Sequence, residues 1–115
     1  MNLYYLSQTV VSGYDTFSDA VVSAETEEEA RFTHPGSPYI SGELQYKEKT
    51  FWSPEHKAWM TDERLELAKK YPYEDWLWES PRYDWPEPSQ VKVTLVGVAL
   101  EGTPSGVVCA SYHQG

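Results

Sequence analysis

Two arginines are the side chains in this sequence best suited to bind a phosphate. A guanidinium offers a planar fork of donors, which matches phosphate oxygens better than an ammonium does. Arg31 is expected on a short helix, and Arg82 falls inside a loop that is rich in aromatic residues. Either arginine could instead form a surface ion pair, so the sequence leaves both interpretations open.

Small and hydroxyl-bearing residues cluster near the C-terminus and form a second candidate binding element. The cluster consists of Gly102, Thr103, Ser105 and Gly106. Its amides and hydroxyls could hold a small polar ligand, although the same composition is typical of a turn between strands. Tyr14, an aromatic residue in a predicted loop, could stack on a base or pack in the core, and the sequence favours neither.

No set of residues matches a catalytic motif or a metal site, so we expect the chain not to be an enzyme. Cys109 lies in an apolar run and is expected to be a small buried core residue rather than a nucleophile. The histidines His34, His56 and His113 do not stand at metal-ligand spacing, and we expect them to be structural. The acidic run at Glu27–Glu29 is typical of a helix start. We expect no cofactor.

Composition describes one acidic domain of 115 residues with a formal net charge of −9. A broad basic surface for nucleic acid is therefore not expected, although a small, locally positive pocket for an anion is compatible with this charge. No apolar stretch approaches the roughly 20 residues that span a membrane. No secretory signal is visible, and one cysteine cannot form an intramolecular disulfide. We therefore expect a cytoplasmic protein without a membrane partner.

The elements that must position these residues are predicted at the two ends of the chain. Residues 2–8 and 19–24 are expected to be strands, and a helix with a capping box follows over residues 27–34. Near the C-terminus, residues 91–100 and 107–113 are expected to form a hairpin. This order predicts an α+β fold, in which one largely antiparallel sheet carries the short helix on one face.

The central residues 36–89 are predicted to be an insertion between the core segments 1–35 and 90–115. Within the insertion, Ser53-Pro54 is typical of a helix start, and a further helix is expected from residue 61 to 70 or 71. All five tryptophans of the chain lie in this insertion, partly in a segment rich in proline. The aromatic segment could be a lid, a pocket wall or an oligomer contact.

Three stretches together resemble a known family. They are the start LYYLSQTVVSGYDTFSDAVVSAETEEEARFTHP, the late strand VKVTLVGVALEG and the ending GVVCASYHQG. The pattern covers about half of the chain and is similar to that of the Thoeris anti-defence proteins of bacteriophages. That family binds cyclic ADP-ribose isomers made by bacterial TIR-domain enzymes. It holds them without cleavage, in oligomers with pockets between subunits.

The resemblance implies roles for residues at both ends of the chain. Tyr14 would stack on the adenine, and Ser111 would be a polar residue of the pocket. Arg31 and the donors around residues 102–106 would contact pyrophosphate or ribose. Ser105 stands where a basic residue is expected in relatives. An identical phosphate site, or a second site for cyclic oligonucleotides, is therefore not implied.

Two functions follow from these observations. The first is a phage protein that sequesters a nucleotide signal, as a homo-oligomer in the cytoplasm of the infected bacterium, and so blocks a host defence. The second is an acidic inhibitor that binds a host defence protein directly, as a DNA mimic of the anti-CRISPR type would. The net charge of −9 suits this second function. A sponge would release its small molecule intact on denaturation, whereas a protein inhibitor would co-purify with a host target.

Overall fold

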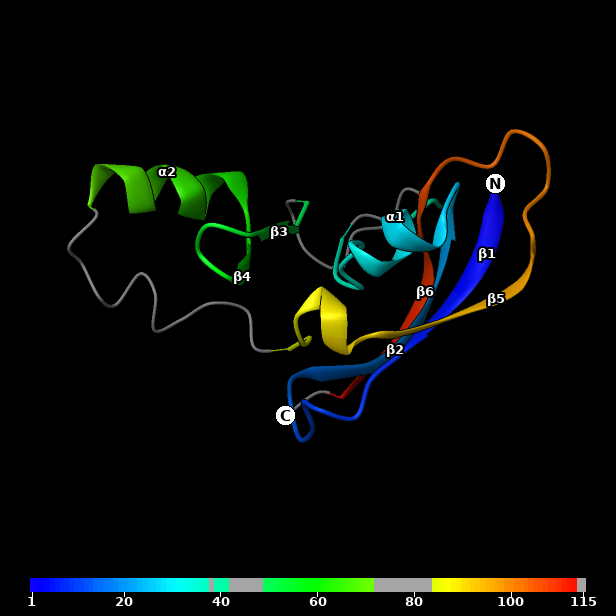
Figure 1. Cartoon of the computed structure of the whole chain (residues 1–115), viewed down its shortest axis with the longest axis horizontal. Helices are drawn as coiled ribbons and strands as arrows, with labels where there is room; N and C mark the ends of the chain where they lie inside the picture. The colour runs from blue at the N-terminus through cyan, green and yellow to red at the C-terminus, as the bar shows by residue number, and fades with distance from the viewer. Residues whose placement is uncertain (38, 42–48, 72–83, 114–115) are drawn as a thin grey trace.

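Four strands form one antiparallel sheet in the computed structural model of the chain, which describes residues 1–37, 39–41, 49–71 and 84–113. The strands are β1 (Asn2–Ser7), β2 (Thr16–Ala24), β5 (Lys92–Val98) and β6 (Gly106–His113). Their spatial order is β5-β1-β2-β6 (Figure 1). The N-terminal hairpin therefore lies at the centre of the sheet, and the two C-terminal strands lie at its edges. The α+β fold predicted from the sequence is confirmed.

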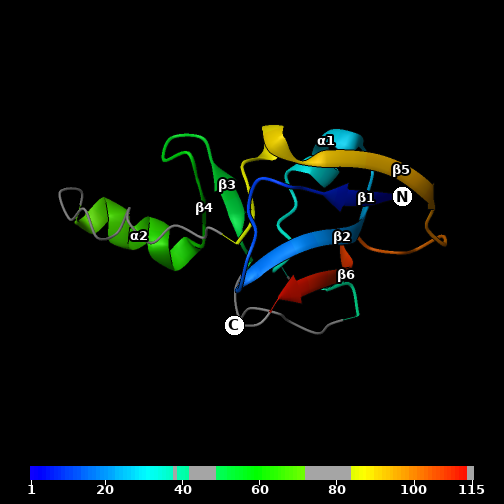
Figure 2. The same cartoon turned by 90° about the horizontal axis from the view of Figure 1, so that it is seen from below.

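The two C-terminal strands do not form the predicted hairpin. β5 pairs with β1 and β6 pairs with β2, so the central hairpin separates them. The connection over residues 99–105 consequently crosses the end of the sheet, as Figure 2 shows. The apolar pattern identifies each strand, but it carries no signal for the partner of a strand, because both edges of the central hairpin can accept one.

Helix α1 (Glu27–Arg31) begins at the predicted capping box and ends earlier than predicted. The Thr26 hydroxyl accepts a hydrogen bond from the Glu29 amide at 3.1 Å, and the Glu29 carboxylate accepts one from the Glu25 amide at 3.3 Å. After Arg31, the Thr33 hydroxyl donates to the Glu29 carbonyl at 2.9 Å and closes the last turn. Ala30 is the buried residue of α1, which packs against β1, β2 and β5.

The core of the sheet includes residues from the central insertion as well as from the two ends of the chain. Its buried members are Tyr4, Leu6, Phe17, Val22, Ala24, Ala30, Trp59, Trp85, Val91 and Val107. The Trp59 indole N–H donates to the Pro86 carbonyl at 2.8 Å. Two of the tryptophans are thus core residues, while Trp76 and Trp78 lie outside the described residues.

The insertion contains a hairpin where the sequence predicts a helix start at Ser53-Pro54. β3 (Phe51–Ser53) pairs with β4 (Ala58–Met60), and Trp52 lies opposite Trp59 with ring centroids 5.5 Å apart. Cross-strand aromatic pairs of this kind stabilise a hairpin, which explains why the local signal of a proline in a first helical turn is overridden here. The other predicted helix is present as α2 (Asp62–Lys70), in which Ala68 is the buried residue.

A buried polar pair fastens the segment after α1 to the segment before the short 3-10 helix η1 (Pro88–Gln90). His34 is fully buried, and its Nε2 lies 3.0 Å from Asp84 Oδ1. Its Nδ1 accepts a hydrogen bond from the Gly36 amide at 2.9 Å, so this network places the proton on Nε2, which donates to the carboxylate. The structural role predicted for His34 is confirmed.

Candidate functional site

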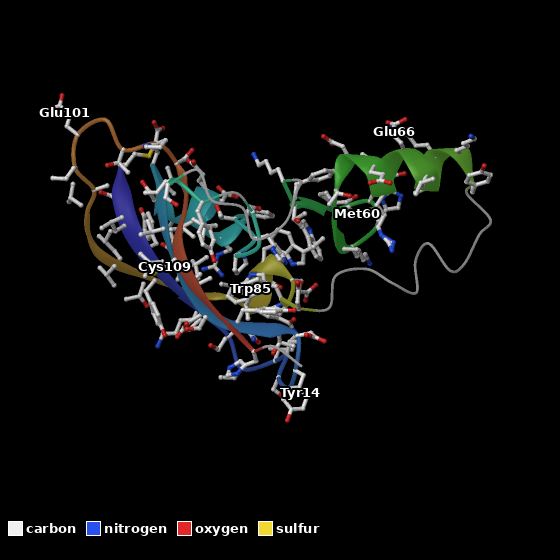
Figure 3. All side chains as sticks on the ribbon, turned by 180° about the vertical axis from the view of Figure 1, so that it is seen from behind. Tyr14, Met60, Glu66, Trp85, Glu101 and Cys109 are labelled. Atoms are coloured by element: carbon white, nitrogen blue, oxygen red, sulfur yellow. The ribbon has the colours of Figure 1, made fainter. Side chains whose placement is uncertain are left out.

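Two of the predicted site elements lie at opposite ends of the sheet. Tyr14 lies in the loop that joins β1 to β2, which we call the Tyr14 loop (residues 8–15). The Gly102 to Gly106 cluster lies in or next to the connection from β5 to β6. Figure 3 shows Tyr14 and Glu101, which marks that connection, at opposite ends of the strands. A single copy of the chain therefore does not bring these two groups together.

A groove beside the start of β6 has two candidate site residues in its wall. We call it the α1–β6 groove, and its volume is about 360 Å³. It is lined by Glu29, Phe32, Thr33, Ser37, Lys49, Thr50, Phe51, Ser105 and Gly106. Two residues of the predicted cluster, Ser105 and Gly106, thus belong to this groove.

The lining of the α1–β6 groove combines flat apolar rings with one ammonium and several hydroxyls. Phe32 is 44% exposed and Phe51 is half-buried, so both rings have accessible surface. Among the described residues of this lining, Lys49 is the one cationic side chain and Glu29 is the one carboxylate. The Ser37 hydroxyl donates to the Thr50 carbonyl at 3.1 Å, which leaves its oxygen lone pairs as acceptors. Such a lining suits a ligand that carries a planar ring, hydroxyls and negative charge.

Gly102 and Thr103 have roles in the turn itself. Both the amide and the hydroxyl of Thr103 donate to the Leu100 carbonyl, at 3.0 and 2.6 Å. Gly102 has a φ of +85°, a conformation that side-chain-bearing residues rarely adopt. The turn interpretation therefore describes these two residues, whereas Ser105 and Gly106 face the groove.

Arg31 lies outside the lining of the groove and links α1 to the start of β5. Its Nη1 donates to the carbonyls of Pro88 and Val91, at 3.1 and 2.5 Å. Its Nη2 lies 3.5 Å from the Glu27 carboxylate, which is the surface ion pair that the sequence allowed. Arg82, the other candidate phosphate donor, lies outside the described residues.

Tyr14 is 79% exposed, so the core-packing interpretation does not apply to it. The Gln8 side chain holds the loop: its amide N–H groups donate to the carbonyls of Val11 and Phe17, both at 2.7 Å. Its oxygen accepts from the amides of Val10 and Val11 at 2.8 Å. Under this loop lies a second hollow of about 280 Å³, whose walls include Ser12, Ser18 and His113.

Ser111 and Cys109 lie on the exposed part of β6 and belong to neither hollow. Ser111 pairs with Asp19, and Cys109 pairs with Val21. The prediction that Cys109 is a buried core residue is wrong. The β2–β6 register shifts between Val21 and Val22, and this bulge changes the face on which Cys109 lies relative to Val107, which is buried.

The groove residues that sequence reasoning missed include Phe32, Lys49 and Phe51. Phe32 caps the end of α1, Lys49 belongs to the weakly patterned stretch before β3, and Phe51 is the first residue of β3. Only the tertiary fold brings them to the start of β6. The described residues contain no group of His, Cys, Asp or Glu that could hold a metal ion. In the same part of the chain, no helix has the length and apolar character needed to cross a membrane.

Comparisons of the chain with protein-family models, with curated proteins and with solved structures found no match.

Proposed function

We propose that the chain binds a nucleotide signal of the cyclic ADP-ribose type and sequesters it without cleavage. The observation that carries this proposal is the α1–β6 groove, whose walls combine Phe32, Phe51 and Lys49 with hydroxyl groups. Aromatic rings stack on bases, an ammonium attracts phosphate, and hydroxyls bond to ribose. The groove volume of about 360 Å³ also lies in the range of pockets that take small molecules.

The ligand class comes from the resemblance of both chain ends to the Thoeris anti-defence proteins. Ser105 and Gly106 support this link, because they line the groove and also belong to the cluster that the resemblance assigns to pyrophosphate or ribose. The biological role follows from the same resemblance. The chain would act as a homo-oligomer in the cytoplasm of an infected bacterium and withdraw the signal from a host defence effector.

Stacking and hydroxyl contacts must provide most of the affinity. The chain has a net charge of −9, so its overall field repels an anionic ligand. Lys49 is the local exception in the lining, and Glu29 in the same lining offsets part of its charge. A ligand with a large aromatic base and few phosphates would therefore fit this groove better than a polyphosphate.

Titration calorimetry against a panel of cyclic ADP-ribose isomers and cyclic dinucleotides tests the proposal. One isomer should bind, and Phe32→Ala or Lys49→Ala should weaken its affinity about tenfold or more, since each removes roughly 1.4 kcal/mol or more of contact. Tyr71→Ala and Lys69→Ala are matched controls, because these exposed side chains lie in or next to α2. Unchanged affinity in both groove variants would refute this site.

Tyr14→Ala distinguishes the two ends of the sheet. The resemblance assigns adenine stacking to Tyr14, and a site that includes Tyr14 predicts that this variant loses binding while the fold, measured by circular dichroism, stays intact. Its high exposure means that little packing is lost. Loss of binding in Tyr14→Ala together with full binding in Phe32→Ala would move the ligand from the α1–β6 groove to the Tyr14 loop.

An acidic inhibitor of a host protein is the second candidate function. Its support is the row of exposed carboxylates at the start of α1, which runs from Glu27 to Glu29 and follows the exposed Glu25. Such a row could occupy a basic groove on a partner. No heat with any nucleotide of the panel, combined with capture of one host protein that Glu27→Lys releases, would favour this function.

A further inference from the structure

The outer edge of β5 carries a row of exposed apolar side chains. These residues are Leu95, Val96 and Val98 of β5, together with Leu100 two residues after the strand, and Val98 reaches 77% exposure. Within the part of the chain that the structure describes, β5 pairs with β1 alone and ends the sheet. Unpaired backbone groups next to apolar side chains make a template for another strand.

The other edge of the sheet is covered differently. Tyr39 forms a parallel bridge with Val107 at the start of β6, and the Ile40 amide donates to the Val107 carbonyl at 2.9 Å. Farther along β6, polar residues are exposed. Among the described residues no isolated bridge covers the β5 edge, and no charged residue and no proline stands between Lys92 and Glu101. Charges and prolines are what commonly keep a free edge from pairing.

Some backbone groups of β5 point toward the free edge of the sheet, where another strand can pair with them. The Ala99 amide donates to the Met1 carbonyl at 3.0 Å, and thus points toward β1. Backbone groups of consecutive residues in a strand point to alternate sides, so the neighbouring Val98 presents its amide and carbonyl to the free edge. The register with β1 shifts between Leu3 and Tyr4, which leaves Val96 as an extra residue in β5. Leu95, opposite Tyr4, therefore faces the free edge together with Val98.

We propose that this edge is a homodimer interface, in which β5 pairs antiparallel with β5 of a second copy and joins two sheets into one. Antiparallel pairing of a strand with its own copy is self-complementary about a two-fold axis, the commonest symmetry of soluble oligomers. The apolar side chains that are exposed in one copy then cover those of the other.

The charges at the ends of the strand favour a second copy as the occupant. Lys92 stands at the start of β5 and Glu101 just beyond its end, and both are exposed. Antiparallel pairing with Leu95 opposite Val98 of the partner subunit brings Lys92 beside Glu101 of the partner subunit. The two-fold axis repeats this contact, so the dimer gains two opposite-charge pairs, whereas parallel pairing would align like charges.

This interface also has a consequence for the site. β5 begins at the sheet end that carries the Tyr14 loop, since Lys92 pairs with Ser7. Antiparallel pairing therefore places the connection after β5 of one copy at the Tyr14 end of the other. The claim that both segments contact the ligand rests on the proposed function, whereas the pairing of β5 with β5 does not. Dimerisation measured without ligand therefore tests the pairing separately.

Sedimentation velocity of the full chain at about 0.15 M salt tests the proposal, because long-range repulsion is screened over roughly 8 Å there. We expect a dimer. Val98→Lys should weaken dimerisation about tenfold or more, since it puts a charge in an apolar contact. Tyr71→Lys is the control, because Tyr71 is exposed but follows α2, outside the β5 edge, and it should dimerise like the wild type.

A charge exchange tests the direction of pairing. Lys92→Glu alone and Glu101→Lys alone should each weaken the dimer, and the double variant should restore it, because opposite charges again face each other. Circular dichroism should show all variants folded, since each substituted side chain is exposed.

A wild-type chain that stays monomeric would overturn the proposal and leave the edge to a strand of another protein. A dimer that Val98→Lys does not weaken would overturn the interface, and a double variant that stays monomeric would overturn the antiparallel pairing.

Discussion

His34 and Asp84 show how one side-chain pair connects distant parts of this chain. Fifty residues separate them in sequence, and the Phe17 amide also donates to the Asp84 carbonyl at 2.9 Å. The His34 ring contacts Phe17 and Trp59 edge-on, with centroids 5.8 and 5.1 Å apart. The pair therefore joins β2, the segment after α1 and the β3–β4 hairpin.

Asp84→Ala should destabilise the fold by about 2 kcal/mol, because it leaves the buried Nε2 donor of His34 without its carboxylate acceptor. Urea unfolding followed by tryptophan fluorescence measures this change. Asp84→Asn is the matched control, since its amide oxygen can still accept from Nε2, and it should lose less stability than Asp84→Ala. Equal losses in the two variants would contradict the hydrogen-bonding role.

Tyr5 should titrate later than an ordinary tyrosine. Its hydroxyl donates to Asp19 Oδ2 at 2.7 Å. This hydrogen bond, followed by burial and by the charge of Asp19, raises the pKa of Tyr5 above the usual 10.0. The protonated form is favoured in the folded state, so the bond contributes its full stabilisation below pH 10.0 and loses it as pH rises through the raised pKa.

The difference in alkaline absorbance titration between the wild type and Tyr5→Phe isolates this residue. We expect its midpoint to lie above 10.0 and to fall toward that value in Asp19→Ala. A midpoint that Asp19→Ala leaves unchanged would show that the carboxylate is not the cause.

At the scale of elements, the connection from β5 to β6 contains Gly102, which has a left-handed backbone conformation. An added Cβ meets no atom within 4 Å at either Gly102 or Gly97, but only Gly102 of these two has a positive φ, +85°. Gly102→Ala should therefore cost about 1 kcal/mol from backbone strain alone, and Gly97→Ala should stay within about 0.5 kcal/mol of the wild type. Thermal unfolding of both variants compares them. Equal stability would show that the connection can change its turn.

Local patterns predicted elements well where the signal lies within the element. The capping box at Thr26 marks the start of α1, and the apolar run before Glu101 marks β5. The partner of each C-terminal strand could not be predicted, because either edge of the N-terminal hairpin can accept a strand. In the structure, β5 lies beside β1 and β6 lies beside β2. The hairpin in place of a helix near Pro54 has a similar cause, since Trp52 and Trp59 stabilise it across strands.

The site was predicted only in part for the same reason. Ser105 and Gly106 were identified because glycine and hydroxyl residues cluster in sequence. Lys49 and the two phenylalanines of the α1–β6 groove come from separate segments, and their local sequence shows nothing that points to a ligand. Tertiary contacts create the groove, and no local pattern in a single sequence predicts which segments make those contacts.

At the scale of the whole molecule, the net charge of −9 should govern how an anionic ligand arrives. Its long-range field repels such a ligand, and added salt shortens the Debye length from about 30 Å at 0.01 M to roughly 8 Å at 0.15 M. The association rate, measured by stopped-flow tryptophan fluorescence, should therefore rise over this range. A falling rate would mean that a positive pocket steers the ligand instead.

Sequestration predicts that the ligand is bound tightly and comes back unchanged. The purified protein would be mixed with a limiting amount of a cyclic ADP-ribose isomer, separated from free ligand, heated, and the released molecule analysed by mass spectrometry. We predict that the isomer co-elutes with the protein and is recovered intact, with the same mass and retention time as the starting compound. Recovery of a hydrolysed product, or no retained isomer across the panel, would contradict the proposed function.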